Sequence, residues 1–256
     1  MSRWADPQVA SYNQTTMEFA GTTVFLFPFA GGTKYSYKHF HEHKPSFLNF
    51  ITLEYPGRGG RANEPLLTDV ESLIEDLYRQ VSVNIKEGPY AFYGHSLGAL
   101  LAFLLARRIR KGGCGEPKHL FLTGCSGPAH VSRSDKSRHL MSKADFMKEI
   151  RELNGSPEEV MENAELFEYF EPILRADFQA SETYMYQGDD PLDISFTVIT
   201  GKEEAIEAEA IRMWQVETNG RVDFKVMPGN HFFISTYYRE IVNIISRKLF
   251  PLNIKS

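Results

Sequence analysis

The chain has 256 residues, of which 42% are hydrophobic and 24% charged, a composition that is ordinary for a globular protein with one sizeable core. Its formal net charge of -5 gives no general attraction to nucleic acid or to an anionic membrane surface. No segment has the roughly 20 apolar residues of a membrane helix, and the opening residues contain no apolar signal-peptide core. We therefore expect a cytoplasmic protein with one domain over residues 1–256 that binds neither nucleic acid nor membrane.

The first half of the chain alternates segments that are typical of buried strands with segments that are typical of helices. The apolar, β-branched run at 22–27 ends at a proline and a glycine pair, as a strand entering a loop does. The residues from Thr68 to Glu71 have the pattern of a capping box, and apolar residues then recur at helical spacing as far as 81. Further strands are predicted at 50–53, 90–93 and 120–123, and a second helix at 97–110.

This alternation is interrupted between 142 and 186, where capping boxes at 142–145 and 156–159 begin helices with no strand between them. We interpret this segment as a helical insertion. Its large apolar residues between 166 and 178 either pack on the domain or face a substrate as a lid does, and the pattern leaves both possibilities open.

The alternation then resumes, with strands predicted at 196–200 and 222–226 and helices at 207–216 and 237–249. Strands that alternate with helices favour a mostly parallel sheet covered by helices on both faces. The sequence therefore predicts an α/β fold whose functional site lies at the carboxyl ends of the strands.

The segment Gly94-His95-Ser96-Leu97-Gly98 matches the pattern G-x-S-x-G. The bare pattern is common, but here it lies directly between a predicted strand and a predicted helix, which is the setting in which it forms the turn of a serine nucleophile. In that setting the serine sits on a tight, strained turn that exposes its hydroxyl at the top of the sheet, and the flanking glycines permit close packing. The motif predicts Ser96 as the nucleophile of a serine hydrolase.

A serine nucleophile needs a general base, which in this architecture is a histidine that follows an acid in the chain. Of the eight histidines, His231 alone follows a late strand and a Pro-Gly loop and precedes the final helix. The acid is expected just after the strand at 196–200, where the chain has Glu203 and Glu204 but no aspartate. Either glutamate can orient the imidazole, and Asp135 is the fallback. Four aspartates lie at the wrong ends of their strands: Asp189, Asp190, Asp193 and Asp223.

The tetrahedral intermediate of such a reaction needs an oxyanion hole, usually formed by the N–H after the nucleophile and one from a loop after an early strand. Leu97 provides the first of these N–H groups. For the second we choose Ala30, in the glycine-containing loop at 28–32.

No metal site or cofactor is predicted. The spacing of His39, His41 and His43 suggests metal ligands, but only the first and third share a helix face, and no carboxylate or cysteine set completes a site. Cys114 and Cys125 form neither a C-x-x-C pair nor half of a zinc site, so we expect reduced thiols.

Five segments together resemble the type II thioesterases, the free-standing editing enzymes of polyketide and nonribosomal peptide assembly lines, which are related to the medium-chain fatty-acid synthase thioesterase. They are FPFAGG at 27–32, YPGRGGR at 55–61, GHSLGALLAFLLAR at 94–107, LRADFQASETY at 174–184 and PGNHFF at 228–233. The resemblance extends from about 22 to 250. It implies an α/β-hydrolase core with a helical lid, and hydrolysis of acyl or aminoacyl groups from the phosphopantetheine arm of an acyl or peptidyl carrier protein. We expect the enzyme to be a monomer.

By the family pattern Ser96 is the nucleophile, His231 the base, and Ala30 and Leu97 supply the oxyanion amides. The chain departs from the pattern at Phe29, where the family usually has histidine, and at Glu204, which takes the register of the catalytic aspartate. These departures leave either a Ser-His-Glu triad, which we favour, or impaired activity.

Two other functions share these features: a carboxylesterase or lipase for small esters, and a catalytically impaired hydrolase-fold binding protein. A carrier protein, being acidic, would need a local basic or apolar docking surface on this acidic chain. Arg138, Lys143, Lys148 and Arg151 are candidates for it, with an ordinary solvated face as the alternative.

Overall fold

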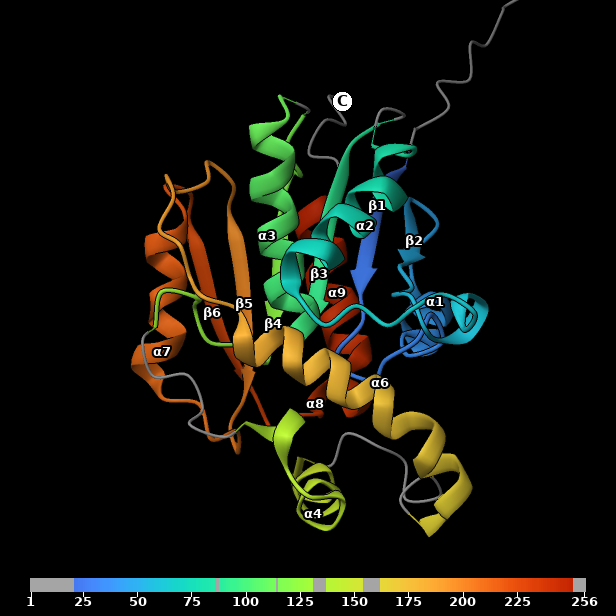
Figure 1. Ribbon diagram of the computed structural model, residues 1–256. Coiled ribbons are helices and arrows are strands. Elements are labelled where there is room, and N and C mark those ends of the chain that lie inside the picture. The colour runs from blue at the N-terminus through green and yellow to red at the C-terminus, as the bar shows by residue number, and fades with distance from the viewer. Residues whose placement is uncertain (1–20, 86–87, 114, 131–136, 154–161, 251–256) are drawn as a thin grey trace, which may run out of the picture.

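A computed structural model describes residues 21–85, 88–113, 115–130, 137–153 and 162–250. Within them, six parallel strands form a sheet in the order β2-β1-β3-β4-β5-β6 (Figure 1). The strands are β1 (Thr22–Phe27), β2 (Leu48–Thr52), β3 (Tyr90–His95), β4 (Leu120–Thr123), β5 (Phe196–Gly201) and β6 (Val222–Met227). The predicted α/β-hydrolase fold, with a parallel sheet between helices, is confirmed.

Helices cover both faces of this sheet. The longer ones are α2 (Val70–Ser82), α3 (Leu97–Lys111), α4 (Lys143–Leu153), α6 (Ala164–Thr183) and α9 (Tyr238–Leu249). The shorter ones are α1 (Lys38–His43), α7 (Ala208–Arg212) and α8 (Phe233–Thr236), and the 3-10 helices are η1 (Gly59–Arg61), η2 (Arg138–Leu140) and η3 (Met213–Glu217). None of the helices in the described parts of the chain is long and apolar enough to cross a membrane.

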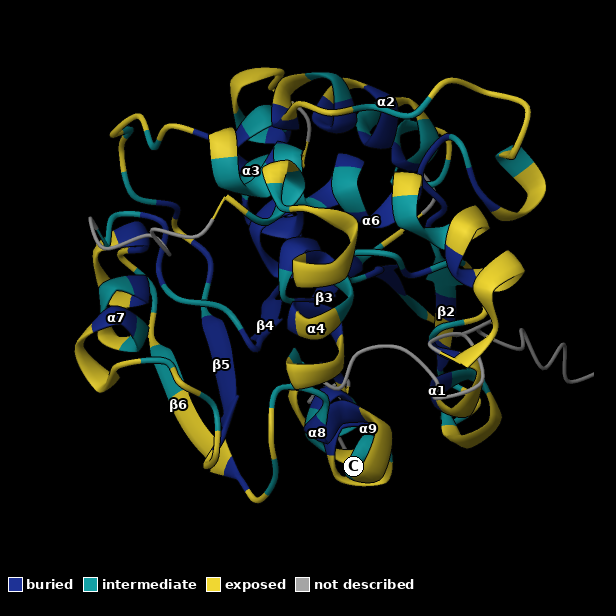
Figure 2. Ribbon diagram, turned by 60° about the horizontal axis from the view of Figure 1, so that its bottom comes forward, coloured by how far each residue is buried: buried dark blue, intermediate teal, exposed yellow. Residues whose placement is uncertain are grey.

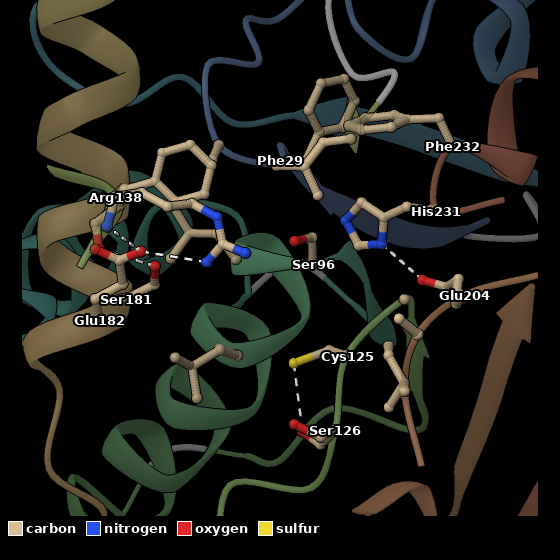
Figure 3. A pocket seen from close by; sticks show the side chains of 18 of the residues that line it. Phe29, Ser96, Cys125, Ser126, Arg138, Ser181, Glu182, Glu204, His231 and Phe232 are labelled. Carbon is tan, nitrogen blue, oxygen red and sulfur yellow. Dashed lines mark hydrogen bonds and ion pairs between the residues drawn. The ribbon is translucent and has the colours of Figure 1, made fainter. Parts of the chain in front are cut away.

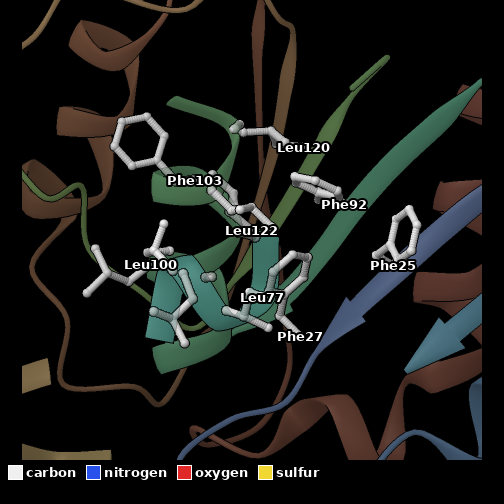
Figure 4. Packing of buried hydrophobic residues seen from close by; sticks show 14 of the residues in the cluster. Phe25, Phe27, Leu77, Phe92, Leu100, Phe103, Leu120 and Leu122 are labelled. Carbon is white, nitrogen blue, oxygen red and sulfur yellow. The ribbon is translucent and has the colours of Figure 1, made fainter. Parts of the chain in front are cut away.

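The strands are apolar on both sides because each side has its own hydrophobic core. In β1, Phe25 and Phe27 pack with α2 and α3 in one core (Figure 4), while Val24 and Leu26 pack with α9 in the other. Successive side chains of a strand point to opposite faces, so a strand covered on both faces is a continuous apolar run. This explains why the strands could be predicted from continuous runs of apolar residues that do not alternate with polar ones.

The predicted strand limits agree for β1 and β4 and differ by one or two residues elsewhere. The helix predicted at 207–216 is α-helical only as far as Arg212 and continues as η3. The sequence did not predict α1 and α8, which at 6 and 4 residues are too short to show a helical period.

The N-terminal cap of α2 differs from the prediction. Asp69, and not Thr68, is the capping residue, because its side chain accepts a hydrogen bond of 2.8 Å from the N–H of Ser72. The predicted box therefore starts one residue too early. The box at 142 is confirmed, since Ser142 Oγ accepts a 3.2 Å bond from the N–H of Asp145, while the one at 156–159 lies outside the described residues.

The two helices α4 and α6 lie across the carboxyl ends of the strands (Figures 1 and 2). They share a small core in which Phe146, Ile150, Phe167 and Leu174 are buried. Phe167 packs inside this small core, whereas Leu174 and Phe178 also line a cavity that contains Ser96.

We expect Asp69→Ala to lower the free energy of unfolding by about 1 kcal/mol, because the substitution leaves an N–H at the start of α2 without its partner. The matched control is Thr68→Ala, which should change it by less than about 0.5 kcal/mol. Urea unfolding followed by circular dichroism measures both. A larger loss for Thr68→Ala than for Asp69→Ala would contradict the assignment of the cap.

Candidate active site

The turn between β3 and α3 places Ser96 at the carboxyl end of the sheet. Ser96 has φ 55° and ψ -119°, a strained conformation for a residue with a side chain. The flanking glycines allow close backbone packing: a Cβ on Gly94 would lie 2.1 Å from the carbonyl oxygen of Gly98, and one on Gly98 would lie 2.1 Å from that of Phe27. The N–H of Ser96 donates to Thr123 at the end of β4, at 2.8 Å. The turn is thus held between three adjacent strands.

His231 and Glu204 lie beside this turn (Figure 3), His231 in the loop after β6 and Glu204 in the loop after β5. His231 Nδ1 is 2.6 Å from Glu204 Oε1. The other carboxylate oxygen accepts a 2.5 Å hydrogen bond from the N–H of Gly201, and the Glu204 side chain is only 2% exposed. With Nδ1–H donating to the carboxylate, the second ring nitrogen, which Figure 3 shows on the side of Ser96, is left to accept a proton.

The structure distinguishes the two predicted glutamates. Glu203 has an exposed side chain, and its backbone N–H donates to the carbonyl of Gly229. Asp135 lies outside the described residues. Among the described carboxylates, Glu204 is therefore the one in contact with His231.

The two predicted oxyanion residues lie next to Ser96. Ala30 and Leu97 both line the cavity that contains Ser96. Leu97 is the first residue of α3, where backbone N–H groups have no partner within the helix and favour negative charge. Phe29, which replaces the family's usual histidine, packs edge-on against Phe232 with ring centroids 5.0 Å apart. It supplies an apolar wall beside His231.

No sequence pattern singled out His95, although it precedes the nucleophile. It is fully buried, its Nδ1 lies 3.0 Å from Thr123 Oγ1, and its ring centroid is 4.8 Å from that of His231. Burial, with a contribution from the nearby His231, holds the pKa of His95 well below its usual value. His95 is therefore neutral and does not add a positive charge beside His231.

The cavity has a volume of about 510 Å³ and extends from Ser96 to α4 and α6. Its apolar walls come from Leu100, Ile150, Leu153, Leu174 and Phe178, and its polar residues include Ser126, Arg138, Ser181 and Glu182. Arg138 forms ion pairs with Glu149 at 2.9 Å and with Glu182 at 3.3 Å, and its side chain is 16% exposed. It lines the cavity and is not the surface cation that the sequence suggested. Lys143 and Lys148 are exposed and lie near Glu171 and Glu152.

The histidines of α1 have protein partners. His41 Nε2 is 2.8 Å from Thr52 Oγ1, and His43 Nδ1 donates to the carbonyl of His39 at 2.9 Å. In the described ranges no group of three or more His, Cys, Asp or Glu residues is arranged to hold a metal ion. Cys125 is half-buried and forms no disulfide within the described ranges, and its Sγ donates to the carbonyl of Ser126 at 3.3 Å. Cys114 lies outside the described residues.

The chain matches the protein family described as thioesterase domain over residues 22–249. It belongs to this family. The thioesterase assignment accounts for the whole described sheet, since the match includes β1 to β6. The chain is a thioester hydrolase, and the resemblance drawn from its sequence motifs is confirmed.

Several relatives of this thioesterase carry the name of a biosynthetic pathway. It is 31% identical over 240 residues to the gramicidin S biosynthesis protein GrsT of Aneurinibacillus migulanus, covering 93% of this chain and 92% of the relative. Its fold matches the RedJ thioesterase of the prodiginine pathway in Streptomyces coelicolor, with a TM-score of 0.84, 28% identity and coverage of 97% and 91%. It also matches YbtT, a type II thioesterase of the yersiniabactin NRPS/PKS pathway, with a TM-score of 0.80, 26% identity and coverage of 90% and 93%.

We expect Glu204→Gln to lower kcat/KM by about 100-fold or more, because a neutral amide neither stabilises the imidazolium form of His231 nor fixes its tautomer. The matched control is Glu203→Gln, one residue away and exposed, which should stay within about twofold of wild type. Steady-state thioester hydrolysis measures both. Equal losses, or a larger loss for Glu203→Gln, would mean that Glu204 is not the acid.

Proposed function

We propose that this thioesterase hydrolyses acyl or aminoacyl groups from the phosphopantetheine arm of acyl or peptidyl carrier proteins, as an editing or releasing enzyme of polyketide, nonribosomal peptide or fatty acid synthesis. The observation that carries the proposal is the contact between His231 and Glu204 beside Ser96, at a large cavity, in a chain related to GrsT. We propose that it acts in the cytoplasm as a monomer and that its single domain carries α4 and α6 as a lid.

In the proposed mechanism, Ser96 Oγ attacks the thioester carbonyl while His231 takes its proton. Glu204 holds the imidazole and stabilises its cation. The oxygen of the tetrahedral intermediate, now negative, accepts hydrogen bonds from the N–H groups of Ala30 and Leu97. When the intermediate collapses, His231 returns the proton to the departing thiol and an acyl-Ser96 ester remains.

The second half of the reaction uses the same groups. Water enters, His231 takes one of its protons, and the resulting hydroxide attacks the acyl-Ser96 carbonyl. The second tetrahedral intermediate occupies the same oxyanion hole. Collapse releases the carboxylic acid, and the proton held by His231 returns to Ser96 Oγ.

The cavity walls support an acyl substrate. Leu100, Ile150 and Leu174 offer apolar contact between Ser96 and the proposed lid. Glutamate has one methylene more than the aspartate of the family pattern, yet the Glu204 carboxylate lies 2.6 Å from His231, within hydrogen-bonding range. This contact favours an active Ser-His-Glu triad over a catalytically impaired binding protein.

We expect kcat/KM for an acyl group on a holo carrier protein to exceed that for the same group on a short thiol mimic by about 10- to 100-fold. Contacts along the arm and on the carrier can stabilise the transition state, and a truncated substrate loses them. The measurement is a side-by-side kinetic comparison with one acyl group.

The control is Ser96→Ala, which should abolish turnover of both substrates and labelling by a fluorophosphonate, with the melting temperature retained. Equal kcat/KM values for carrier and mimic, or faster cleavage of small oxygen esters, would favour a general esterase. Turnover by Ser96→Ala above about a thousandth of wild type would reject Ser96 as the nucleophile.

A further inference from the structure

One carboxylate joins the oxyanion loop to α6. Asp177 of α6 is fully buried and accepts hydrogen bonds from both terminal nitrogens of Arg58, at 2.5 and 2.7 Å. It also accepts a 2.7 Å hydrogen bond from the N–H of Gly31. Arg58, in the loop after β2, is 1% exposed. Arg58 is 119 positions and Gly31 is 146 positions from Asp177 along the chain. Three distant segments therefore meet at the Asp177 side chain.

The N–H groups of Gly31 and Gly32, in the loop after β1, both have acceptors within the protein. Gly32 donates to the carbonyl of Phe29 at 2.8 Å and closes a turn, and Gly31 donates to Asp177. Gly31 has φ 77°, the value that the third position of a type II turn requires. In the described part of the chain, no hydrogen bond uses the N–H of Ala30. That N–H is left for a substrate oxygen.

Packing against α6 holds the same turn in place. A Cβ on Gly31 would lie 2.5 Å from Leu174 Cδ2, so the helix and the turn are in direct contact. The hydroxyl of Tyr55, in the loop after β2, donates to the carbonyl of Pro28 at 2.7 Å. The turn that carries Ala30 is thus fixed between α6 and the loop after β2.

We infer that Asp177 and Arg58 are positioning residues of the oxyanion hole. Asp177 fixes the Ala30–Gly31 peptide, Arg58 fixes Asp177, and together they hold the N–H of Ala30 toward Ser96. Because Asp177 belongs to α6, the oxyanion hole is complete only when this helix is seated on the sheet. The inference rests on the proposed function, in which Ala30 stabilises the oxyanion.

Asp177→Asn tests this with a substitution of the same shape. The neutral amide has a single carbonyl oxygen, and its NH₂ group would face the N–H donors of Arg58 or Gly31. We expect kcat for thioester hydrolysis to fall about 10- to 100-fold with KM within about threefold, because the lost interaction acts on the transition state.

A second readout separates this role from loss of structure. A boronic acid forms a tetrahedral adduct on Ser96 and places an oxygen in the oxyanion hole, so Asp177→Asn should weaken its binding by about the same factor as kcat. A thioether analogue of the substrate cannot form a tetrahedral adduct and stays in the ground-state geometry. It should bind to Asp177→Asn as tightly as to wild type.

Arg107 and Glu217 provide a matched control. This pair is also buried, with exposed fractions of 6% and 0%, and its ion pair is 2.8 Å long. Arg107 lies ten residues along α3 from Leu97, which corresponds to about 15 Å. We therefore expect Glu217→Gln and Asp177→Asn both to lower the melting temperature, but Glu217→Gln to leave kcat and boronate binding unchanged.

Arg58→Lys is the second variant, because Asp177→Asn could fail to fold. A lysine keeps the charge but not the paired hydrogen bonds, so kcat and boronate affinity should fall together by a smaller factor. The inference is overturned if the folded Asp177 and Arg58 variants keep wild-type kcat and boronate affinity, if their losses appear only in KM, or if Glu217→Gln loses kcat equally. If wild type fails to hydrolyse thioesters, or Ser96→Ala remains active, the proposed function itself is rejected.

Discussion

The strained backbone at Ser96 is the constraint on which the rest of the site depends. A non-glycine residue at φ 55° costs of the order of 1–3 kcal/mol, and it persists only where the surrounding structure fixes it. Here the fixing contacts are the approach of Gly98 to the carbonyl of Phe27 and of Gly94 to the carbonyl of Gly98. Phe27 ends β1, so the same contact that permits the turn also brings the loop with Ala30 beside Ser96.

The end of β4 supports the rest of the site. β4 lies between β3, which leads to Ser96, and β5, which leads to Glu204. A Cβ on Gly124, directly after β4, would lie 2.4 Å from His95 Cε1 and 3.3 Å from Glu204 Oε1. The absence of a side chain there lets His95 and Glu204 occupy the space between the strands, so Glu204 can reach His231 from the neighbouring loop. The glutamate's extra methylene is accommodated with its carboxylate held by Gly201.

The sequence predicted the sheet well, because buried parallel strands are continuous apolar runs. It also located the turn at Ser96, because a strained serine turn needs glycines at fixed positions, and it placed His231 in the loop after the last strand. Without the family register, which favoured Glu204, the residues alone could not decide between Glu203 and Glu204, which are adjacent and chemically alike. The direction of each side chain depends on the turn after β5. Nor could the sequence pair Arg58 with Asp177, since each charge, taken alone, suggests a solvated surface and their partnership depends on how α6 crosses the sheet.

That pairing is hard to explain by stability alone. Removing two charges from water costs several kcal/mol per ion, and well-packed apolar residues in their place often give equal or greater stability. An apolar side chain at position 177, however, could not accept the N–H of Gly31, which lies in a half-buried turn and would lose its partner. An uncharged amide could take that N–H, but its single carbonyl oxygen could not also accept the paired hydrogen bonds of Arg58. The carboxylate is the group that satisfies both donors at once, and this ties the geometry of the loop around Ala30 to the position of α6.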